Sequence, residues 1–397
     1  MPDPEARLHH GSHRGLLQPV ADLAPDGPGV DAIIVPTARR PAYLAAVGQL
    51  AETLKCPLVT LHSTKWTTAA DAARRLGGDV DLIAIDVPPE TGRLNLPAWE
   101  TSRLLAGTVF ARRTDVSAKR NLALMLSYML GWSRVLFLDD DITKLDPGDV
   151  RMAGRLLDKH NAVGLCNDGF PDNSVVCHAY RLAGGRQQAF VGAGALAIEL
   201  TRSRSFFPDI YNDDWFFLLD GDRYLQSTAA TGHVYQRSYD PFRTPDRARG
   251  EELGDVLAEG LYWLLDQDRS IMEADEPHWS MFLARRGQFI QDILEMVERA
   301  AIDPHEKDRQ IAALRGSLGR LALITPALCE RYLAAWAADR RQWRRHVDLL
   351  RTREQRPAAL AALSRRGSPR LTWCLSESGG PQAAQASRPA DRQLVPK

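Results

Sequence analysis

Three adjacent carboxylates at the end of an apolar run are the residues of this sequence best suited to chemistry. The run Val135–Leu138 has no polar alternation, which predicts a strand buried on both faces, and Asp139, Asp140 and Asp141 follow it directly. Carboxylates this close repel one another unless a positive charge lies among them. Mg²⁺ and Mn²⁺ favour carboxylate oxygens together with substrate phosphates. We therefore expect a metal–diphosphate site at the carboxyl end of this strand, where open α/β sheets bind ligands. The alternative is a solvated loop whose aspartates cap the next helix.

Two other places carry residue types of the same kind. Asp213 and Asp214 form a second acidic pair within an aromatic segment, and Trp215 follows them. Asp213 can also cap a short helix at this point. Gly192 and Gly194 interrupt an apolar run that is otherwise typical of a strand. Glycine inside a strand marks a bulge or a close approach of the backbone to a ligand, so this segment is a candidate binding segment.

The elements that must position these residues alternate in type from residue 31 onward. Apolar runs predict strands over 31–36, 57–62 and 82–85, and helical periodicity predicts helices over 42–54, 68–76 and 117–130. Such alternation implies right-handed crossovers, so we expect an α/β fold with a mostly parallel sheet flanked by helices. The segment 87–115 is expected to be a long working loop, and 167–186 to be irregular.

The pattern changes near Pro245, because only helical periodicity is found after it. We expect four parts: a flexible N-terminal segment over 1–30, a catalytic α/β domain over 31–244, an all-helical C-terminal appendage over 245–370, and a disordered tail over 371–397.

The helical region contains an unusual density of arginine. Between Arg331 and Arg370, eleven arginines stand against three acidic residues and are interleaved with tryptophans. This composition indicates either a solvated helix face or a contact surface for an anionic acceptor, partner or membrane.

Composition limits the class of protein. The 397 residues carry 50 basic and 50 acidic side chains, and this zero net charge argues against a dedicated nucleic-acid binder. Five scattered cysteines fit a reducing compartment better than a disulfide framework. No apolar run approaches the roughly 20 residues of a membrane span, and the N-terminus lacks a signal-peptide core. We expect a soluble cytoplasmic protein.

Five short motifs, in order along the chain, resemble those of the GT-A-type, family 2-like nucleotide-sugar glycosyltransferases. They are Ile33–Pro41 with its Pro-Thr-x-x-Arg-Pro turn, Lys119-Arg120-Asn121, Leu136–Asp141 with the DXD motif, Gly192-x-Gly194, and Asp213-Asp214-Trp215. The resemblance covers about 31–242 and does not extend to the C-terminal helices. It implies a metal-dependent transferase of the hexosyltransferase type, moving a sugar from a UDP- or GDP-sugar to an acceptor hydroxyl.

The resemblance also implies roles for single residues. The donor would be bound by Pro36, Thr37, Arg39, Asp86, Arg120, Asn121, Asp139 and Asp140, and the acceptor by Gly192, Gly194 and Trp215. Mn²⁺ or Mg²⁺ would be bound by Asp139, Asp141 and His233. Asp214 would be the general base for an inverting reaction, and Asp213 would orient the acceptor or cap the helix.

The sequence departs from the family pattern at one position and also fits a second family. The second strand of the family commonly ends on an acid, whereas this one ends at His62, so Asp86 on the next strand would take the donor contact. Asp139-Asp-Asp141-Ile-Thr143 also matches the Asp-x-Asp-x-Thr string of haloacid-dehalogenase-like phosphatases, in which Asp139 would be the nucleophile. That motif normally opens its domain, whereas three strands precede it here.

Overall fold

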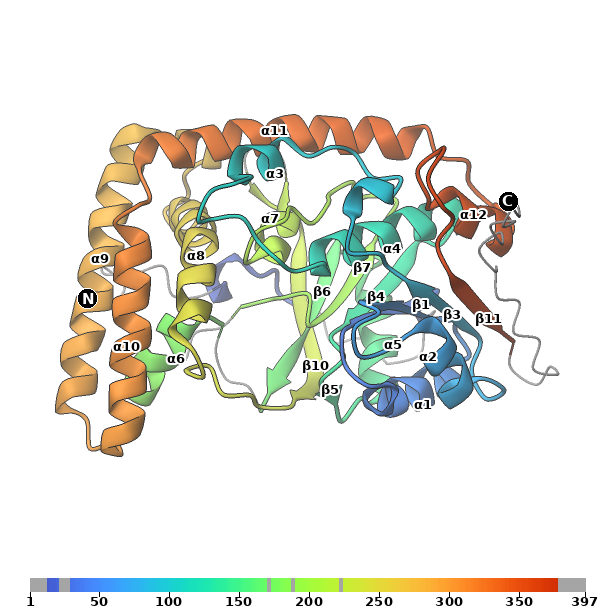
Figure 1. Cartoon of the computed structure of the whole chain (residues 1–397), viewed down its shortest axis with the longest axis horizontal. Helices are drawn as coiled ribbons and strands as arrows, with labels where there is room; N and C mark the ends of the chain where they lie inside the picture. Colours follow the sequence, from blue (N-terminus) through green and yellow to red (C-terminus); the bar gives the residue numbers. More distant parts are fainter. Residues whose placement is uncertain (1–12, 21–28, 170–172, 187–189, 221–223, 378–397) are drawn as a thin grey trace, which may run out of the picture.

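The computed structural model describes residues 13–20, 29–169, 173–186, 190–220 and 224–377 (Figure 1). Within this part of the chain, the main sheet has nine strands in the order β11-β3-β2-β1-β4-β7-β6-β10-β5. They are β1 (Ala32–Thr37), β2 (Leu58–His62), β3 (Leu82–Asp86), β4 (Arg134–Leu138), β5 (Ile142–Thr143), β6 (Ala162–Asp168), β7 (Ala195–Glu199), β10 (Thr228–Gln236) and β11 (Trp373–Ser376), and the short strands β8 (Leu219–Asp220) and β9 (Tyr224–Leu225) pair separately.

The sheet is mixed, with most of its strands running in one direction. Strands β3, β2, β1 and β4 pair in parallel, and β6 pairs in parallel with β10. Strand β7 lies antiparallel between β4 and β6, while β11 and β5 run antiparallel at the two edges. The carboxyl ends of β1, β4, β6 and β10 therefore lie on the same side of the sheet, at one end of the strands.

Helices cover both faces of this sheet. On one face lie α1 (Ala45–Leu54), α2 (Ala69–Leu76) and α5 (Pro147–Leu156). On the other lie α3 (Glu100–Leu105), α4 (Val116–Leu130), α6 (Val175–Leu182) and α7 (Asp213–Leu218), followed by the C-terminal helices α8 (Pro245–Leu265), α9 (Glu276–Arg299), α10 (Pro304–Leu321), α11 (Pro326–Asp348) and α12 (Arg356–Ala362). Residues of β1 alternate between the two cores, as a strand buried on both faces requires: Ala32 and Ile34 face one, Ile33 and Val35 the other.

The helical C-terminal region is confirmed, but it does not stand apart from the sheet. In Figure 1, α8, α9 and α10 lie at one end of the sheet and α11 runs across to the other. The buried Trp343 of α11 lies 6.1 Å from Trp99 and 6.5 Å from Phe206, measured between ring centroids. One apolar cluster thus continues from the sheet into these helices.

Two expected chain ends differ from the structure. In the segment expected to be flexible, His13 is fully buried and its ring lies 4.1 Å from that of Trp215. In the expected tail, 373–376 form β11, which completes the edge of the sheet beside β3. Residues 1–12 and 378–397 lie outside the described part of the chain.

Three expected element assignments are also corrected. The expected loop 87–115 contains α3, and the expected irregular segment 167–186 contains α6. Strand β7 begins only at Ala195, so the two glycines lie in the loop before it. Thr68 and Asp71 form a capping box at the start of α2.

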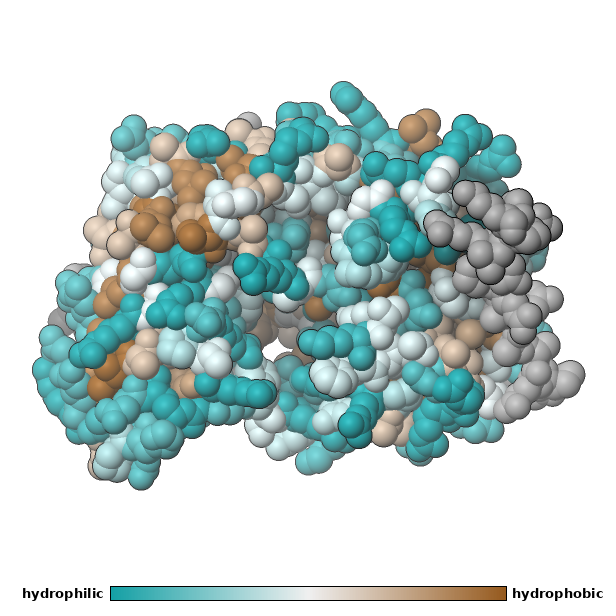
Figure 2. Space-filling model, in the orientation of Figure 1, coloured by the Kyte–Doolittle hydropathy of each residue, from teal (hydrophilic) through white to brown (hydrophobic). Residues whose placement is uncertain are grey.

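The surface is largely hydrophilic, with apolar residues gathered where α9, α10 and α11 meet (Figure 2). Among the helices described, none is alone both long and apolar enough to cross a membrane, and the pair α10 and α11 passes that test only jointly, with a bend of 80°.

Candidate active site

A cleft of about 780 Å³ opens at the edge of the sheet where the parallel strands end. Thr37 ends β1, Asp139 follows β4, Asp168 ends β6 and Gln236 ends β10, and all four line the cleft. The strand directions alone bring these positions together, because they place the carboxyl ends of four strands side by side.

The aspartate trio lies inside this cleft and is held by the turn after β1. The Oγ1 of Thr37 donates to Oδ2 of Asp140 over 2.7 Å, and the backbone N–H of Ala38 donates to the same oxygen over 3.2 Å. Arg39 Nη1 lies 2.8 Å from Asp140 Oδ1 and 2.9 Å from Asp141 Oδ2. The Pro-Thr-Ala-Arg turn thus neutralises part of the charge that the trio carries.

Arg120 connects the two acidic groups. It is the fifth residue of α4, is buried, and binds Asp213 Oδ1 over 2.7 Å and Asp139 Oδ1 over 3.2 Å. The hydroxyl of Ser117 donates to Asp213 Oδ2 over 2.8 Å. The helix begins at Val116 with Asp115 at its N-cap, so Ser117 lies inside the first turn of α4, where its side chain is buried.

Asp214 is held by backbone rather than by another charge. Its Oδ2 accepts from the N–H of Ala193 over 2.7 Å, and its Oδ1 accepts from the N–H of Trp215 over 2.9 Å. Burial, and next the charge of Asp213, raise the pKa of Asp214 above its ordinary value, while Arg120 opposes the rise. A Cβ on Gly192 would lie 2.9 Å from Asp214 Oδ2, so this glycine allows the loop to approach the carboxylate closely.

The charge of the cleft is unbalanced toward the acidic side. Seven carboxylates line it, those of Asp115, Asp139, Asp140, Asp141, Asp168, Asp213 and Asp214. Four cationic side chains line it, those of Arg39, Arg112, Lys119 and Arg120. Burial, and the nearby charges of Asp141 and Asp140, raise the pKa of Asp139, although Arg120 lowers it. A bound cation would remove this repulsion.

The carboxylates fit an open metal site rather than a closed one. Among the described residues, no group of three or more His, Cys, Asp and Glu side chains is placed so that it could hold a metal ion by itself. Asp139 and Asp141 still supply the donor chemistry of Mg²⁺ and Mn²⁺ sites, which use one or two carboxylates and complete the shell with water and substrate phosphates. The donor set therefore fits a metal that a phosphate-bearing ligand completes.

Two residues expected to bind the donor lie elsewhere. The carboxylate of Asp86 accepts from the N–H of Ala69 over 2.7 Å at the start of α2, outside the cleft lining. His62, beside it in the sheet, is buried between Thr60 and Thr67. Asn121 points away from the cleft, because its amide exchanges hydrogen bonds of 2.8 and 2.9 Å with the backbone of Phe207. It holds α4 to the loop before α7.

Two other expected site residues are also outside the cleft lining. Trp215 is buried and packs between His13 and Tyr262, so it belongs to the core rather than to an acceptor platform. The exposed ring of His233 bonds Asp168 over 3.2 Å and is not brought to the aspartate trio. Pro36, Gly192 and Gly194 do line the cleft.

Lys119, Ser63 and Gln236 make further polar contacts at the cleft that were not predicted from the sequence. Lys119 Nζ, on a buried side chain, donates to the backbone oxygen of Thr37 over 2.8 Å, contacts the hydroxyl of Ser63, and lies 3.1 Å from Asp115. Gln236 reaches Asp141 over 3.3 Å. A polar residue directly after a predicted strand is the signal that could have found Ser63, whereas no strand was predicted before Gln236.

No protein-family model and no curated protein matches the chain. Among solved structures, the mannosyltransferase PcManGT from Pyrobaculum calidifontis in complex with GDP-Man and Mn²⁺ is similar to it at 17% sequence identity, with a TM-score of 0.40. The match covers 81% of this chain and 90% of that chain. A likeness this weak says nothing about the reaction, so the function is argued from the cleft.

Proposed function

We propose that the chain is a metal-dependent glycosyltransferase that moves a sugar from a nucleoside-diphosphate sugar to an acceptor hydroxyl. One observation carries the proposal: Asp139–Asp141, Arg120 and Asp214 converge in a single cleft at the carboxyl ends of the parallel strands. Its volume of about 780 Å³ is within the range of ligand sites that bury a drug-sized molecule.

The donor's diphosphate would lie between the aspartate trio and the cationic side chains. Mg²⁺ or Mn²⁺ held by Asp139 and Asp141 would supply Lewis-acid stabilisation of the leaving diphosphate. Arg120 is held in place by two carboxylates, so its positive charge would stabilise the leaving diphosphate without the side chain having to move. Arg39 is the more exposed cation and can leave the aspartates to meet a phosphate.

The acceptor hydroxyl would lie beside Asp214, next to the glycine loop. In a reaction that inverts the anomeric carbon, Asp214 takes the hydroxyl proton as the new C–O bond forms and the bond to the diphosphate breaks. The nucleoside diphosphate leaves with the electron pair of that bond. The raised pKa of Asp214 makes it a stronger base than an exposed aspartate once it is ionised.

Release of nucleoside diphosphate from a panel of UDP- and GDP-sugars with Mn²⁺ tests the proposal. We expect slow hydrolysis of one donor by the wild type and a loss of about 10²–10⁴-fold in Asp214→Asn. The control is Asp292→Asn, because Asp292 is a half-buried acid on α9 that bonds only Gln288 among the described residues, and this variant should match the wild type. No turnover of any donor, together with hydrolysis of p-nitrophenyl phosphate that requires Asp139, would replace this proposal with the phosphatase.

A further inference from the structure

A second pocket, of about 360 Å³, lies at the amino-terminal end of the parallel strands, whereas the cleft lies at their carboxyl end. Asn161 precedes β6, and Arg202–Ser205 follow the antiparallel β7, so both lie where the parallel strands begin. The length of β6, about 20 Å at 3.3 Å per residue, separates this end from the cleft. The pocket is therefore not part of the proposed active site.

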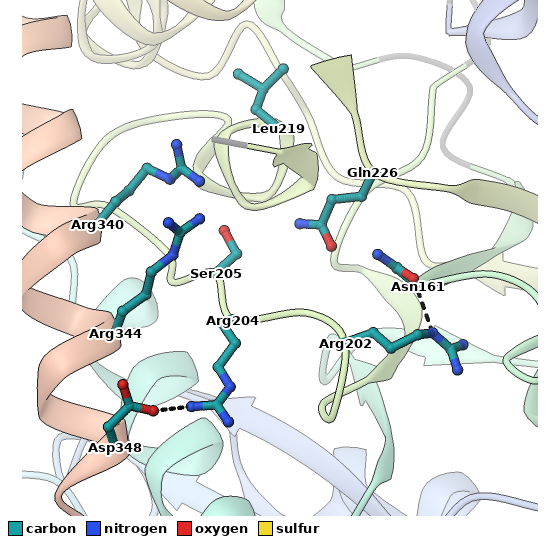
Figure 3. A pocket seen from close by; sticks show the side chains of 9 residues that line it. All are labelled: Asn161, Arg202, Arg204, Ser205, Leu219, Gln226, Arg340, Arg344 and Asp348. Carbon is teal, nitrogen blue, oxygen red and sulfur yellow. Dashed lines mark hydrogen bonds and ion pairs between the residues drawn. The ribbon is translucent and has the colours of Figure 1, made fainter. Parts of the chain in front are cut away.

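Arginines dominate the lining of this pocket (Figure 3). Arg340 and Arg344 project from α11 four residues apart, with Asp348 one turn further on the same helix face. Arg202 and Arg204 come from the loop after β7. Among the described lining residues, four guanidinium groups thus accompany one carboxylate.

Two of these arginines, Arg202 and Arg344, have no carboxylate partner among the described residues. Arg204 pairs with Asp348. Arg202 donates instead to neutral acceptors, among them the backbone oxygen of His160 over 2.8 Å and Oδ1 of Asn161 over 3.2 Å. Arg344 is exposed and makes no hydrogen bond or ion pair with any residue that the structure describes. The charge on Arg344 is thus free to meet a ligand.

Two buried polar atoms in the same lining have no hydrogen-bond partner among the described residues. Ser205, 5% exposed, leaves its hydroxyl unpaired, and Gln226, 6% exposed, leaves its carbonyl Oε1 unpaired although its Nε2 donates to Phe217. Figure 3 shows both side chains directed into the pocket between the arginines. Buried polar groups are normally paired, so these two atoms indicate that a polar ligand completes the pocket.

We propose that this pocket binds a small phosphate-bearing ligand. Its anionic oxygens would accept from Arg344, Arg204 and the hydroxyl of Ser205, because guanidinium groups bind phosphate through charge-assisted hydrogen bonds. Gln226 Oε1 would accept from the P–O–H of a monoprotonated phosphate or from a neighbouring hydroxyl of the ligand. The arginine-rich stretch of the helical region thus contributes a defined pocket rather than a diffuse basic surface.

Calorimetric titration with inorganic phosphate and pyrophosphate tests this site. EDTA is included, because without a metal the acidic cleft repels anions. We expect saturable binding to the full chain and weakening of about tenfold or more in Arg344→Gln. Arg345→Gln removes the same charge from an exposed position next to the pocket and should bind as the wild type. Ser205→Ala should weaken binding severalfold, and donor turnover should be unchanged in Arg344→Gln.

The same proteins distinguish the source of the phosphate. Sedimentation with vesicles of phosphatidylglycerol and phosphatidylcholine, against phosphatidylcholine alone, separates a lipid headgroup from a free phosphate. Whether the ligand is a free phosphate or a lipid headgroup, Arg344→Gln should lose the binding and Arg345→Gln should keep it. Equal losses in the two arginine variants, or an absence of saturable phosphate binding, would overturn the proposal, the first because a diffuse basic surface would then be responsible.

Discussion

Arg120 is the side chain on which the acidic groups of the cleft depend for compensation. It lies buried between Asp213 and Asp139, and Asp213 is itself buried. Removing one partner of a buried ion pair leaves an uncompensated charge and costs about 3–5 kcal/mol. We therefore expect Arg120→Ala to lower the free energy of unfolding by about that amount, measured by urea denaturation.

The control for this prediction is Arg299→Ala. Arg299 pairs with Glu295 on the exposed side of α9, and surface pairs contribute about 0–1 kcal/mol. An Arg120→Ala protein as stable as Arg299→Ala would mean that the two aspartates do not need the guanidinium, and the described electrostatics of the cleft would be wrong.

The proposed role of Asp214 as the base predicts how activity depends on pH. The base must be ionised, and its pKa is raised from the ordinary value of 3.8, so activity should fall as pH decreases through a midpoint above 3.8. The measurement is the pH profile of kcat/KM for donor and acceptor. Asp214→Asn should lose the activity and, in whatever turnover remains, this limb of the profile. A midpoint at or below 3.8 in the wild type would contradict the assignment of Asp214 as the base.

Most residues expected from the sequence to form the site line the cleft, whereas Asp86, Asn121, Trp215 and His233 lie outside its lining. Asp139–Asp141 could be found because a strand that ends in acids is a local pattern. Asp213 and Asp214 form an acidic pair within an aromatic segment, and Arg120 lies in a motif that resembles one of the glycosyltransferase family. Asn121 and Trp215 occupy family-like positions, but their side chains face Phe207 and Tyr262. Which way a side chain faces depends on packing partners far away in the sequence.

Helices α8 and α9 are joined by a buried ionic cluster that reaches the residue before the proposed catalytic pair, Asp213 and Asp214. Arg286 of α9 binds Glu252, Asp255 and Glu259 of α8 over 2.8–3.0 Å. Asp255 in turn accepts from Nδ2 of Asn212 over 2.9 Å, and Asn212 directly precedes Asp213. The cluster is fully buried, and its bond to Asn212 helps to fix the position of α7, which begins at the next residue.

We expect Arg286→Ala to destabilise the protein by about 3–5 kcal/mol in urea denaturation, because three carboxylates would lose their cation. Donor turnover should also fall in conditions where the variant remains folded, since Asn212 loses its support. Folding and turnover like those of Arg299→Ala would show that α8 and α9 are not coupled to the catalytic pair.

At the scale of elements, periodicity predicted the long helices and the buried strands but not the short pieces. Helix α6 has eight residues and begins with two valines, which favour strands; it is helical because it packs against α8, α9 and α10. Strand β11 has four residues beyond the helical region, and only its pairing with β3 defines it. Pairing between segments almost 300 residues apart leaves no local pattern in a sequence.

The segment after the C-terminal helices returns to the sheet, because β11 pairs with β3. The helical region and the α/β sheet are therefore connected at this edge as well as through the shared core. Leu371, Trp373 and Cys374 are buried, and β11 covers the edge of β3. An uncovered sheet edge is a template for association between molecules. A chain that ends at Gly367 should therefore lose at least about 3 kcal/mol of stability, as expected for removing a buried tryptophan, and should aggregate on warming.

Its matched control ends at Glu377 and removes only residues beyond β11. Differential scanning calorimetry with light scattering should show this control to unfold like the full chain. Equal behaviour of the two shortened chains would mean that β11 does not stabilise the sheet. In the full chain, calorimetry should show one cooperative transition, because a single apolar core continues across the domain boundary expected near Pro245.

Electron paramagnetic resonance of Mn²⁺ tests the central claim most directly. The carboxylates form an open site, so Mn²⁺ should bind the protein weakly alone and at least about tenfold more tightly with UDP or GDP, because phosphate oxygens complete the coordination. Asp141→Asn should abolish this gain and Asp292→Asn should preserve it. Mn²⁺ affinity that is independent of both nucleotides, or unchanged in Asp141→Asn, would contradict a cation and a diphosphate sharing the aspartate trio.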